Sequence, residues 1–120
     1  MTLVPYLKSS GEHKSKPTQH SVKELQSFGI MPDIIIARCD EPLDQSIRQK
    51  IALFCNVQED CVIENLTLPV LYQAPMMLEE NGLADIVCRE LQLSCGPCDL
   101  TEWKQMLERI ENADKTVSIA

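Results

Sequence analysis

The segment at residues 32–40, PDIIIARCD, constrains the fold more than any other part of the chain. Three consecutive isoleucines between a proline and an aspartate predict a strand that is buried on both faces, because a strand with one solvent-exposed face alternates apolar and polar residues. Strands that are buried on both faces are typical of parallel sheets, which helices cover on each side. The segment therefore predicts an α/β fold with a parallel sheet.

Two other short apolar runs predict further strands. TLVPYL at residues 2–7 precedes the isoleucine strand, and CVIENL at residues 61–66 follows it. Each interval between these runs holds a segment with helical periodicity. The order strand, helix, strand, helix, strand implies right-handed crossovers between the parallel strands of one sheet.

Caps and breakers mark the boundaries of the two crossover helices. The first helix is expected from Pro17, which suits a first turn, to Gly29, which suits a stop. The second helix is expected to begin after Asp44 as its N-cap. The apolar stripes expected to face the core are Val22, Leu25 and Phe28 on the first helix, and Ile47, Ile51 and Phe54 on the second.

The last part of the chain is predicted to be mainly helical. Residues 70–93 predict two helical pieces interrupted at Pro75 and Gly82, and residues 100–114 predict a further helix. The stripe of that last helix consists of Leu100, Trp103, Leu107 and Ile110. Residues 115–120, KTVSIA, predict the beginning of a strand. Since the chain opens on one strand and closes on the start of another, we expect a piece of a longer protein.

The composition is that of a soluble globular protein. Its apolar content of 44% and charged content of 24% are ordinary for that class, and no apolar run approaches the roughly 20 residues that span a bilayer. The formal net charge of −7 argues against general binding of nucleic acid, which requires a basic face. The N-terminus lacks a signal-peptide pattern, so we expect a cytoplasmic protein whose six cysteines are free thiols.

Positive charge is concentrated in one stretch of this acidic chain. Apart from Glu12, the ionisable side chains of residues 8–23 are Lys8, His13, Lys14, Lys16, His20 and Lys23. Solvated side chains are one interpretation, and an anion site is the other. Lys14 and Lys16 favour an anion site because they follow a strand and precede a helix N-terminus, and Lys50 lies near the apolar stripe of the second helix.

The cysteines and histidines supply two other candidate groups. The CGPC tetrapeptide from Cys95 to Cys98 has the spacing of a thioredoxin active site, but it follows a helical segment, and Asp99 would oppose a thiolate. A loop with two incidental thiols is the favoured interpretation, with a redox pair and part of a zinc site as alternatives. His13 and His20 have no ligand partner at suitable spacing and are expected to be solvated, so no metal site is predicted.

Two stretches resemble the CTP synthase family, the glutamine-dependent enzymes that aminate UTP. They are LVPYLKSSGEHKSKPTQHSVKELQSFGIMPDIIIARCD and KIALFCNV. The resemblance implies that residues 1–93 form the later half of the synthetase (amidoligase) domain, residues 94–114 an interdomain linker with a helix, and residues 115–120 the first strand of the glutaminase domain. It also implies a three-layer Rossmann-like parallel sheet of the P-loop and dethiobiotin-synthetase type, present in part.

The resemblance further implies a reaction and its partners. ATP and Mg²⁺ phosphorylate the uracil 4-oxygen of UTP, and ammonia from glutamine then displaces the phosphate to give CTP. Members of the family are homotetramers with a glutaminase domain in the same chain. This chain has no P-loop, and the implied catalytic residues and Mg²⁺ ligands lie outside it, so the isolated chain is expected to be inactive.

The same resemblance assigns site residues. The implied UTP and CTP contacts are Lys14, Ser15, Lys16, Pro17, Thr18, Gln19 and Lys50. The implied ATP contacts, around the adenine, are Arg38, Leu66, Thr67 and Leu68. At that rim the chain departs from bacterial relatives, which carry an acidic pair. The alternatives are a stand-alone nucleotide-binding α/β module without catalysis and a thiol-redox protein that uses Cys95 and Cys98.

Overall fold

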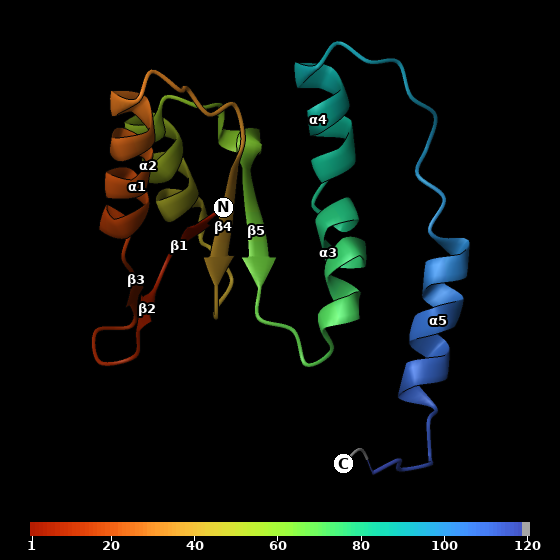
Figure 1. Cartoon of the computed structure of the whole chain (residues 1–120). Helices are drawn as coiled ribbons and strands as arrows, with labels where there is room; N and C mark the ends of the chain where they lie inside the picture. The colour runs from red at the N-terminus through yellow and green to blue at the C-terminus, as the bar shows by residue number, and fades with distance from the viewer. Residues whose placement is uncertain (119–120) are drawn as a thin grey trace.

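A computed structural model describes residues 1–118 and contains a three-stranded parallel sheet. Its strands are β1 (Thr2–Leu3), β4 (Ile35–Cys39) and β5 (Val62–Leu66), in the order β1–β4–β5 (Figure 1). Both pairings are parallel, with Thr2 opposite Ala37 and Ile35 opposite Val62. The predicted α/β fold with a parallel sheet is confirmed.

The isoleucine strand β4 occupies the centre of this sheet and is covered on both faces. Ile35, Ala37 and Cys39 are buried in the core on one side. Ile34 and Ile36 pack against a second apolar cluster on the other side. Burial on both faces was predictable because a central strand with helices above and below has no wet face.

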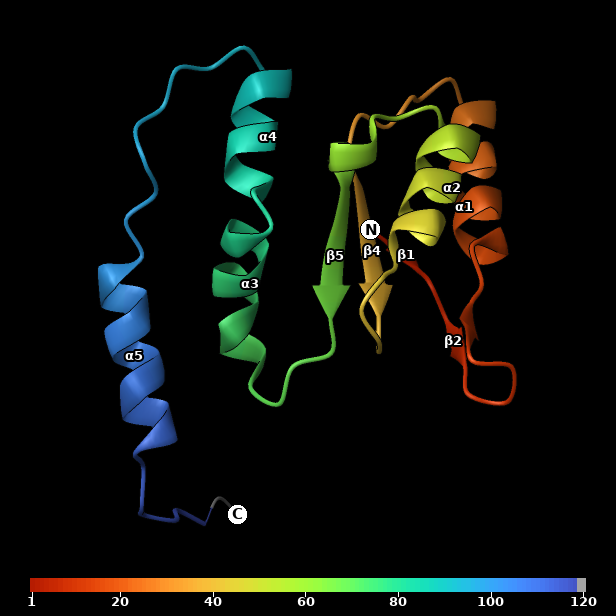
Figure 2. The same ribbon diagram turned by 180° about the vertical axis from the view of Figure 1, so that it is seen from behind.

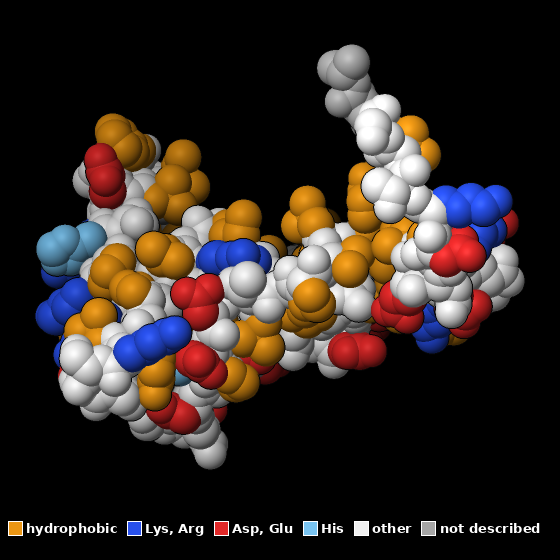
Figure 3. Space-filling model, turned by 90° about the horizontal axis from the view of Figure 1, so that it is seen from below, with side chains coloured by type: hydrophobic (Ala, Val, Ile, Leu, Met, Phe, Trp, Pro, Cys, Tyr) orange, Lys and Arg blue, Asp and Glu red, His pale blue; other side chains and the backbone are white. Residues whose placement is uncertain are grey.

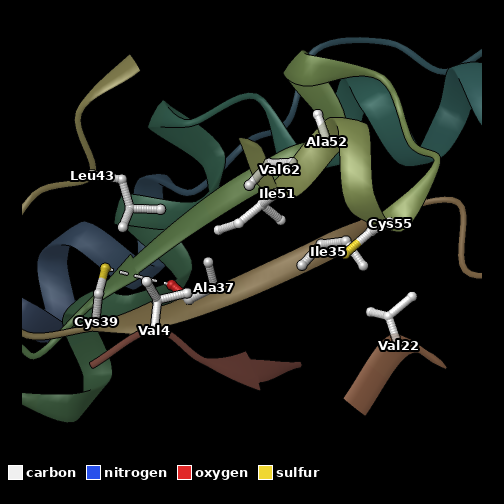
Figure 4. Close-up of a cluster of buried hydrophobic side chains, with 10 residues drawn as sticks. All are labelled: Val4, Val22, Ile35, Ala37, Cys39, Leu43, Ile51, Ala52, Cys55 and Val62. Atoms are coloured by element: carbon white, nitrogen blue, oxygen red, sulfur yellow. Dashed lines mark hydrogen bonds between the residues drawn. The ribbon is translucent and has the colours of Figure 1, made fainter. Parts of the chain in front are cut away.

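Helices α1 (Lys16–Ser27) and α2 (Gln45–Cys55) cover the first face of the sheet, as Figure 1 and Figure 2 show from opposite sides. Asp44 caps α2 as expected, and its carboxylate accepts a hydrogen bond of 2.9 Å from the backbone N–H of Ile47. The buried side chains between these helices and the sheet, shown in Figure 4, are Val4, Val22, Ile35, Ala37, Cys39, Leu43, Ile51, Ala52, Cys55 and Val62.

Helices α3 (Ala74–Glu80) and α4 (Leu83–Glu90) cover the other face, which completes three layers. Short 3₁₀ helices, η1 (Glu59–Cys61) and η2 (Leu71–Gln73), lie before and after β5. Gly82 separates α3 from α4 as predicted, with a φ of 74°. The predicted interruption at Pro75 is wrong: the proline lies in the first turn of α3, where a missing N–H donor is tolerated.

The predicted strand at residues 2–7 is two strands. The N–H of Val4 donates to the carbonyl of Arg38 at 2.8 Å, but Pro5 has no N–H to continue the ladder, and the chain leaves the sheet. Strand β2 (Tyr6–Leu7) instead pairs in antiparallel fashion with β3 (Glu12–His13). The stretch before α1 is therefore a hairpin.

Two aromatic side chains assigned to core-facing stripes are exposed. Phe28 is 74% exposed because α1 ends at Ser27 and Phe28 is its C-cap residue. Phe54 is 51% exposed and lies on α2 beside the start of α1. Ile51 is fully buried, so the prediction of an amphipathic helix is confirmed. The predicted apolar stripe was too wide, because it included Phe54.

Helix α5 (Thr101–Glu111) lies beside η2 and α3. The indole N–H of Trp103 donates to the carbonyl of Tyr72 at 2.7 Å, and Leu107 is buried. Residues 91–100 have no helix or strand, and residues 115–118 are not in a strand; the rest of the predicted strand lies outside the described residues. The Cα radius of gyration is 17.1 Å, above the roughly 14 Å of a compact domain of this length.

Candidate functional site

The start of α1 is anchored at the carboxyl edge of the sheet. The hydroxyl of Thr18 donates to the carbonyl of Leu3, the last residue of β1, at 3.1 Å. The hydroxyl of Thr2 in turn donates to that of Thr18 at 3.3 Å. Because Thr18 is fully buried, these bonds fix the N-terminal turn of the helix against β1. Open α/β sheets place their ligands at this edge.

Three lysines from different elements meet at this helix start. Lys14 follows β3, Lys16 is the first residue of α1, and Lys50 lies in α2. The ammonium group of Lys16 lies 5.9 Å from the ring centroid of Phe54, one turn after Lys50 on α2. Figure 3, which looks onto the carboxyl edge, shows basic side chains over the part of the surface that includes the hairpin, α1 and α2.

Glu12 is the acidic neighbour of this lysine group. Its carboxylate accepts a hydrogen bond of 2.5 Å from the ammonium group of Lys14. The hydrogen bond from Lys14 is the main reason why the pKa of Glu12 lies below its usual value, and the charges of Lys14 and Lys50 lower it further. Lys50 therefore lies within electrostatic range of the same carboxylate as Lys14, and Lys16 lies over Phe54 on the helix that carries Lys50.

The polar residues of the predicted motif are mostly buried. Ser15 is 4% exposed and Gln19 is 5% exposed, and the amide of Gln19 donates to the hydroxyl of Ser15 at 3.0 Å. Together with Thr18, these side chains hold the N-terminal turn in shape, whereas Lys16 and Pro17 are exposed. Direct contacts of Ser15, Thr18 and Gln19 with a nucleotide remain a prediction.

The expectation that His13 is solvated is wrong. Its side chain is 7% exposed, its Nε2 lies 3.0 Å from the carbonyl oxygen of Glu41, and its ring packs edge-on against that of Tyr6. The alternation along β3 turns His13 inward and Glu12 outward. His13 thus ties the hairpin to the loop after β4, a role that could not be recognised without the hairpin. His20 is exposed, as expected.

The predicted ATP residues lie at the same edge of the sheet, around a hollow of about 460 Å³. The guanidinium of Arg38 donates to the carbonyl of Leu66 at 3.2 Å, and Leu68 lines the same hollow. Its remaining walls are Met1, Thr2, Leu3, Asn65, Leu71 and Ala74. Thr67 does not line it, because its hydroxyl donates to the carboxylate of Asp40 at 2.6 Å.

The lysine group and the Arg38 hollow lie on opposite faces of the sheet. Ala37 and Cys39 point toward α1 and α2, so Arg38 between them points to the other face. An anion fits the lysine group, and a flat apolar ring fits a hollow with a guanidinium on its wall. Within residues 1–118, no group of three or more potential metal ligands is arranged around an ion.

The cysteines divide by burial. Cys39, Cys55 and Cys61 are buried, and burial raises the pKa of each, to about 11 for Cys39. Cys95 and Cys98 are exposed in the loop before α5. All six are free thiols, in agreement with the prediction.

None of the helices within residues 1–118 has the length and apolar character needed to cross a membrane.

Comparisons with known proteins agree on one family. The model of the CTP synthase N-terminus matches residues 1–93. A CTP synthase of Ruminiclostridium cellulolyticum is 54% identical over 119 residues, which are 99% of this chain and 22% of that protein. CTP synthases of Clostridium kluyveri and Geobacillus kaustophilus are 52% and 50% identical over 100% and 99% of the chain, and again 22% of each relative is covered. The chain, which spans 22% of the length of these relatives, therefore belongs to the CTP synthase family.

Proposed function

We propose that this chain is the part of a CTP synthase that holds the triphosphate of UTP, or of CTP as feedback inhibitor. The complete protein aminates UTP to CTP with ATP and with ammonia released from glutamine. The convergence of Lys14, Lys16 and Lys50 at the N-terminus of α1 is the observation that carries this proposal.

The chemistry of the lysine group suits a triphosphate. Ammonium groups form charge-assisted hydrogen bonds with phosphate oxygens, and the N-terminus of a helix favours negative charge. Lys14 is paired with Glu12, so an incoming phosphate must compete with that carboxylate for the ammonium group of Lys14. The buried bonds of Ser15, Thr18 and Gln19 keep the helix start fixed, so that the backbone of the first turn needs little reordering when the nucleotide binds.

The hollow beside Arg38 suits the adenine of ATP. Its walls are largely apolar, and a planar guanidinium stacks well on an aromatic base. Arg38 is held by the carbonyl of Leu66, which fixes the plane of the guanidinium. Thr67, turned toward Asp40, contributes through its backbone only.

The domain assignment belongs to the same proposal. The match to the family model ends at residue 93, which supports a boundary between the synthetase domain and a linker at residues 94–114. Residues 115–120 then lead into the glutaminase domain. Mg²⁺, the phosphate-cradling loop and the glutamine site come from other parts of a cytoplasmic, homotetrameric enzyme, and the isolated chain does not catalyse the reaction.

A chimaera tests the triphosphate site. This chain replaces the 119 matching residues of the R. cellulolyticum CTP synthase, and the UTP dependence of CTP formation is measured. A charge-assisted hydrogen bond contributes about 1.5–3 kcal/mol, so Lys14→Ala, Lys16→Ala and Lys50→Ala should each weaken UTP use by roughly 10- to 100-fold. The CTP concentration needed for inhibition should rise in parallel, because the two nucleotides share the triphosphate.

The matched control is Lys8→Ala, which removes an exposed lysine from the turn of the hairpin and should change neither quantity. Glutamine hydrolysis should survive in every variant. Unchanged UTP saturation and CTP inhibition after loss of both Lys14 and Lys16 would show that these lysines are merely solvated. A chimaera that binds UTP but forms no CTP, with ATP, Mg²⁺ and glutamine present, would favour a nucleotide-binding module without catalysis.

A further inference from the structure

Three of the six thiols line one hollow at the C-terminal end of α4. Cys88 comes from the last turn of the helix, and Cys95 and Cys98 come from the loop that follows. The hollow has a volume of about 540 Å³. The charged side chains that face it are Glu79 from α3, and Asp85 and Arg89 from α4. The nucleotide chemistry proposed above uses none of these residues.

The end of α4 brings the loop back over the helix. Gln92 has a φ of 55°, and the N–H of Leu93 donates to the carbonyl of Cys88 at 2.8 Å. The N–H of Gln92 donates to the carbonyl of Arg89 at 3.1 Å. These two bonds form a Schellman motif, which reverses the chain direction at the helix end. The reversal places Cys95 on the same hollow as Cys88, and Cys95 is the neighbour that raises the pKa of Cys88 most.

The arrangement of these thiols favours disulfide formation over metal binding. No group of three or more cysteine, histidine or carboxylate side chains within residues 1–118 is placed around a common ion. Two thiols that line one hollow form a disulfide when the loop brings their Cα atoms within roughly 7 Å. Cys95 and Cys98 are exposed, whereas Cys88 is half-buried. A reagent from solution therefore reaches the loop thiols first.

We propose that Cys88 and Cys95 form a thiol–disulfide exchange site for small-molecule disulfides. In the first step the thiolate of Cys95 attacks one sulfur of the small disulfide, a mixed disulfide forms, and one small thiolate leaves. In the second step the thiolate of Cys88 attacks the Cys95 sulfur and expels the second small thiolate. The protein loses two thiol protons and two electrons, and the small disulfide is reduced to two thiols.

The surroundings of Cys88 make the second step slow at neutral pH. In the reduced protein, contact with the Cys95 thiol, followed by burial and by the charges of Cys95, Asp85 and Glu79, raises the pKa of Cys88. In the mixed disulfide Cys95 no longer carries a thiol, and burial together with the charges of Asp85 and Glu79 still raises the pKa of Cys88. Since the thiolate is the attacking species, the rate of disulfide closure should continue to rise as the pH is raised above the usual thiol range. Arg89 does not oppose this effect, because its guanidinium is engaged by Asp60 and Glu90.

Trypsin separates a disulfide between Cys88 and a loop thiol from a disulfide between the two loop thiols, Cys95 and Cys98. The chain is incubated with glutathione disulfide, its remaining thiols are alkylated, and it is digested and analysed by mass spectrometry. Cleavage after Lys50, Arg89 and Lys104 places Cys88, together with the buried Cys55 and Cys61, in peptide 51–89 and both loop cysteines in peptide 90–104. A bond between Cys88 and Cys95 links the two peptides, whereas a bond between Cys95 and Cys98 stays within peptide 90–104.

The expected product is the linked pair of peptides. It should disappear in Cys88→Ser and in Cys95→Ser, and it should persist in Cys98→Ser, the matched control. In guanidinium chloride the closer pair, Cys95 and Cys98, should dominate instead. The proposal is overturned if the native product is a bond within peptide 90–104, a mixed disulfide alone or no disulfide. A yield of linked peptides equal to that in denaturant would overturn it too, because the fold would then not place the thiols together.

Discussion

Helices α2 and α5 have the same length of 11 residues, and each carries an apolar stripe, yet they are packed very differently. Ile51 of α2 is fully buried between the helix and the sheet. On α5, Leu107 is buried, but Ile110 is 37% exposed. An amphipathic stripe thus identifies a helix but does not show how much of the stripe is buried against the rest of the chain. Because helices of this length depend on tertiary packing, α2 should be far more stable than α5.

Truncation of Ile51 should have the largest effect on stability. Ile51→Ala removes a fully buried side chain and should lower the free energy of unfolding by about 2–5 kcal/mol. The matched control is Leu53→Ala on the same helix, where the side chain is 78% exposed and the change should stay within about 0.5 kcal/mol. Urea unfolding followed by far-UV circular dichroism measures both. Equal effects of the two substitutions would contradict the packing of α2 against the sheet.

Truncation of Leu107 should have a smaller and more local effect. Trp103, the one tryptophan of the chain, lies on α5 and donates to Tyr72, so its fluorescence reports on the attachment of this helix. Leu107→Ala should move the fluorescence transition to lower urea, corresponding to a loss of about 1.5–3 kcal/mol, while the circular dichroism transition of the sheet and α2 moves little. Coincident shifts of both signals would show that α5 and the sheet unfold as one unit.

The cap of α2 should contribute least. Asp44→Ala removes the acceptor for the Ile47 N–H, and solvent exposure of the carboxylate puts the expected loss at about 0.5–1 kcal/mol. Hydrogen bonds from Ser46 and then from the Ile47 N–H lower the pKa of Asp44 in the folded chain. The contribution of the carboxylate is therefore present above the unfolded pKa of about 3.9 and is lost as the pH falls through the lower folded value.

The pH dependence of this effect separates charge from capping geometry. The stability difference between the wild-type chain and Asp44→Ala should shrink as the pH falls below about 4, since protonation disables the acceptor. Asp44→Asn is the control, because asparagine caps helices well and carries no titratable group there. A difference between wild type and Asp44→Ala that stays constant down to pH 2 would exclude the carboxylate as the source of the effect.

The sequence predicted the parts of the fold that depend on local patterns. The isoleucines of β4, the cap at Asp44 and the break at Gly82 each have a local physical cause, and the structure agrees with them. The hairpin of β2 and β3 was missed although Gly11, with a φ of 65°, marks its turn, because each strand has only two residues and their pairing follows from Pro5 leaving the sheet. Since the hairpin was missed, His13 was misassigned as solvated.

The candidate site was predictable in part for a similar reason. Lys14 and Lys16 could be recognised from their place before a helix, but their proximity to Lys50 depends on how α1 packs beside α2, which no local pattern encodes. Phe54 was assigned to the core for its spacing, and the structure instead places it at the surface beside Lys16. Aromatic spacing alone does not separate a core position from a surface position.

An amine-labelling footprint tests the proposed triphosphate site most directly. In the chimaeric enzyme, lysine acetylation is measured peptide by peptide with CTP, with cytidine and without nucleotide. CTP should protect Lys14, Lys16 and Lys50 and leave Lys8 and Lys104 unchanged, whereas cytidine, which has no phosphate, should protect none of the three. Labelling of Lys14, Lys16 and Lys50 that CTP does not alter, in an enzyme that binds CTP, would contradict the assignment of this lysine group as the triphosphate site.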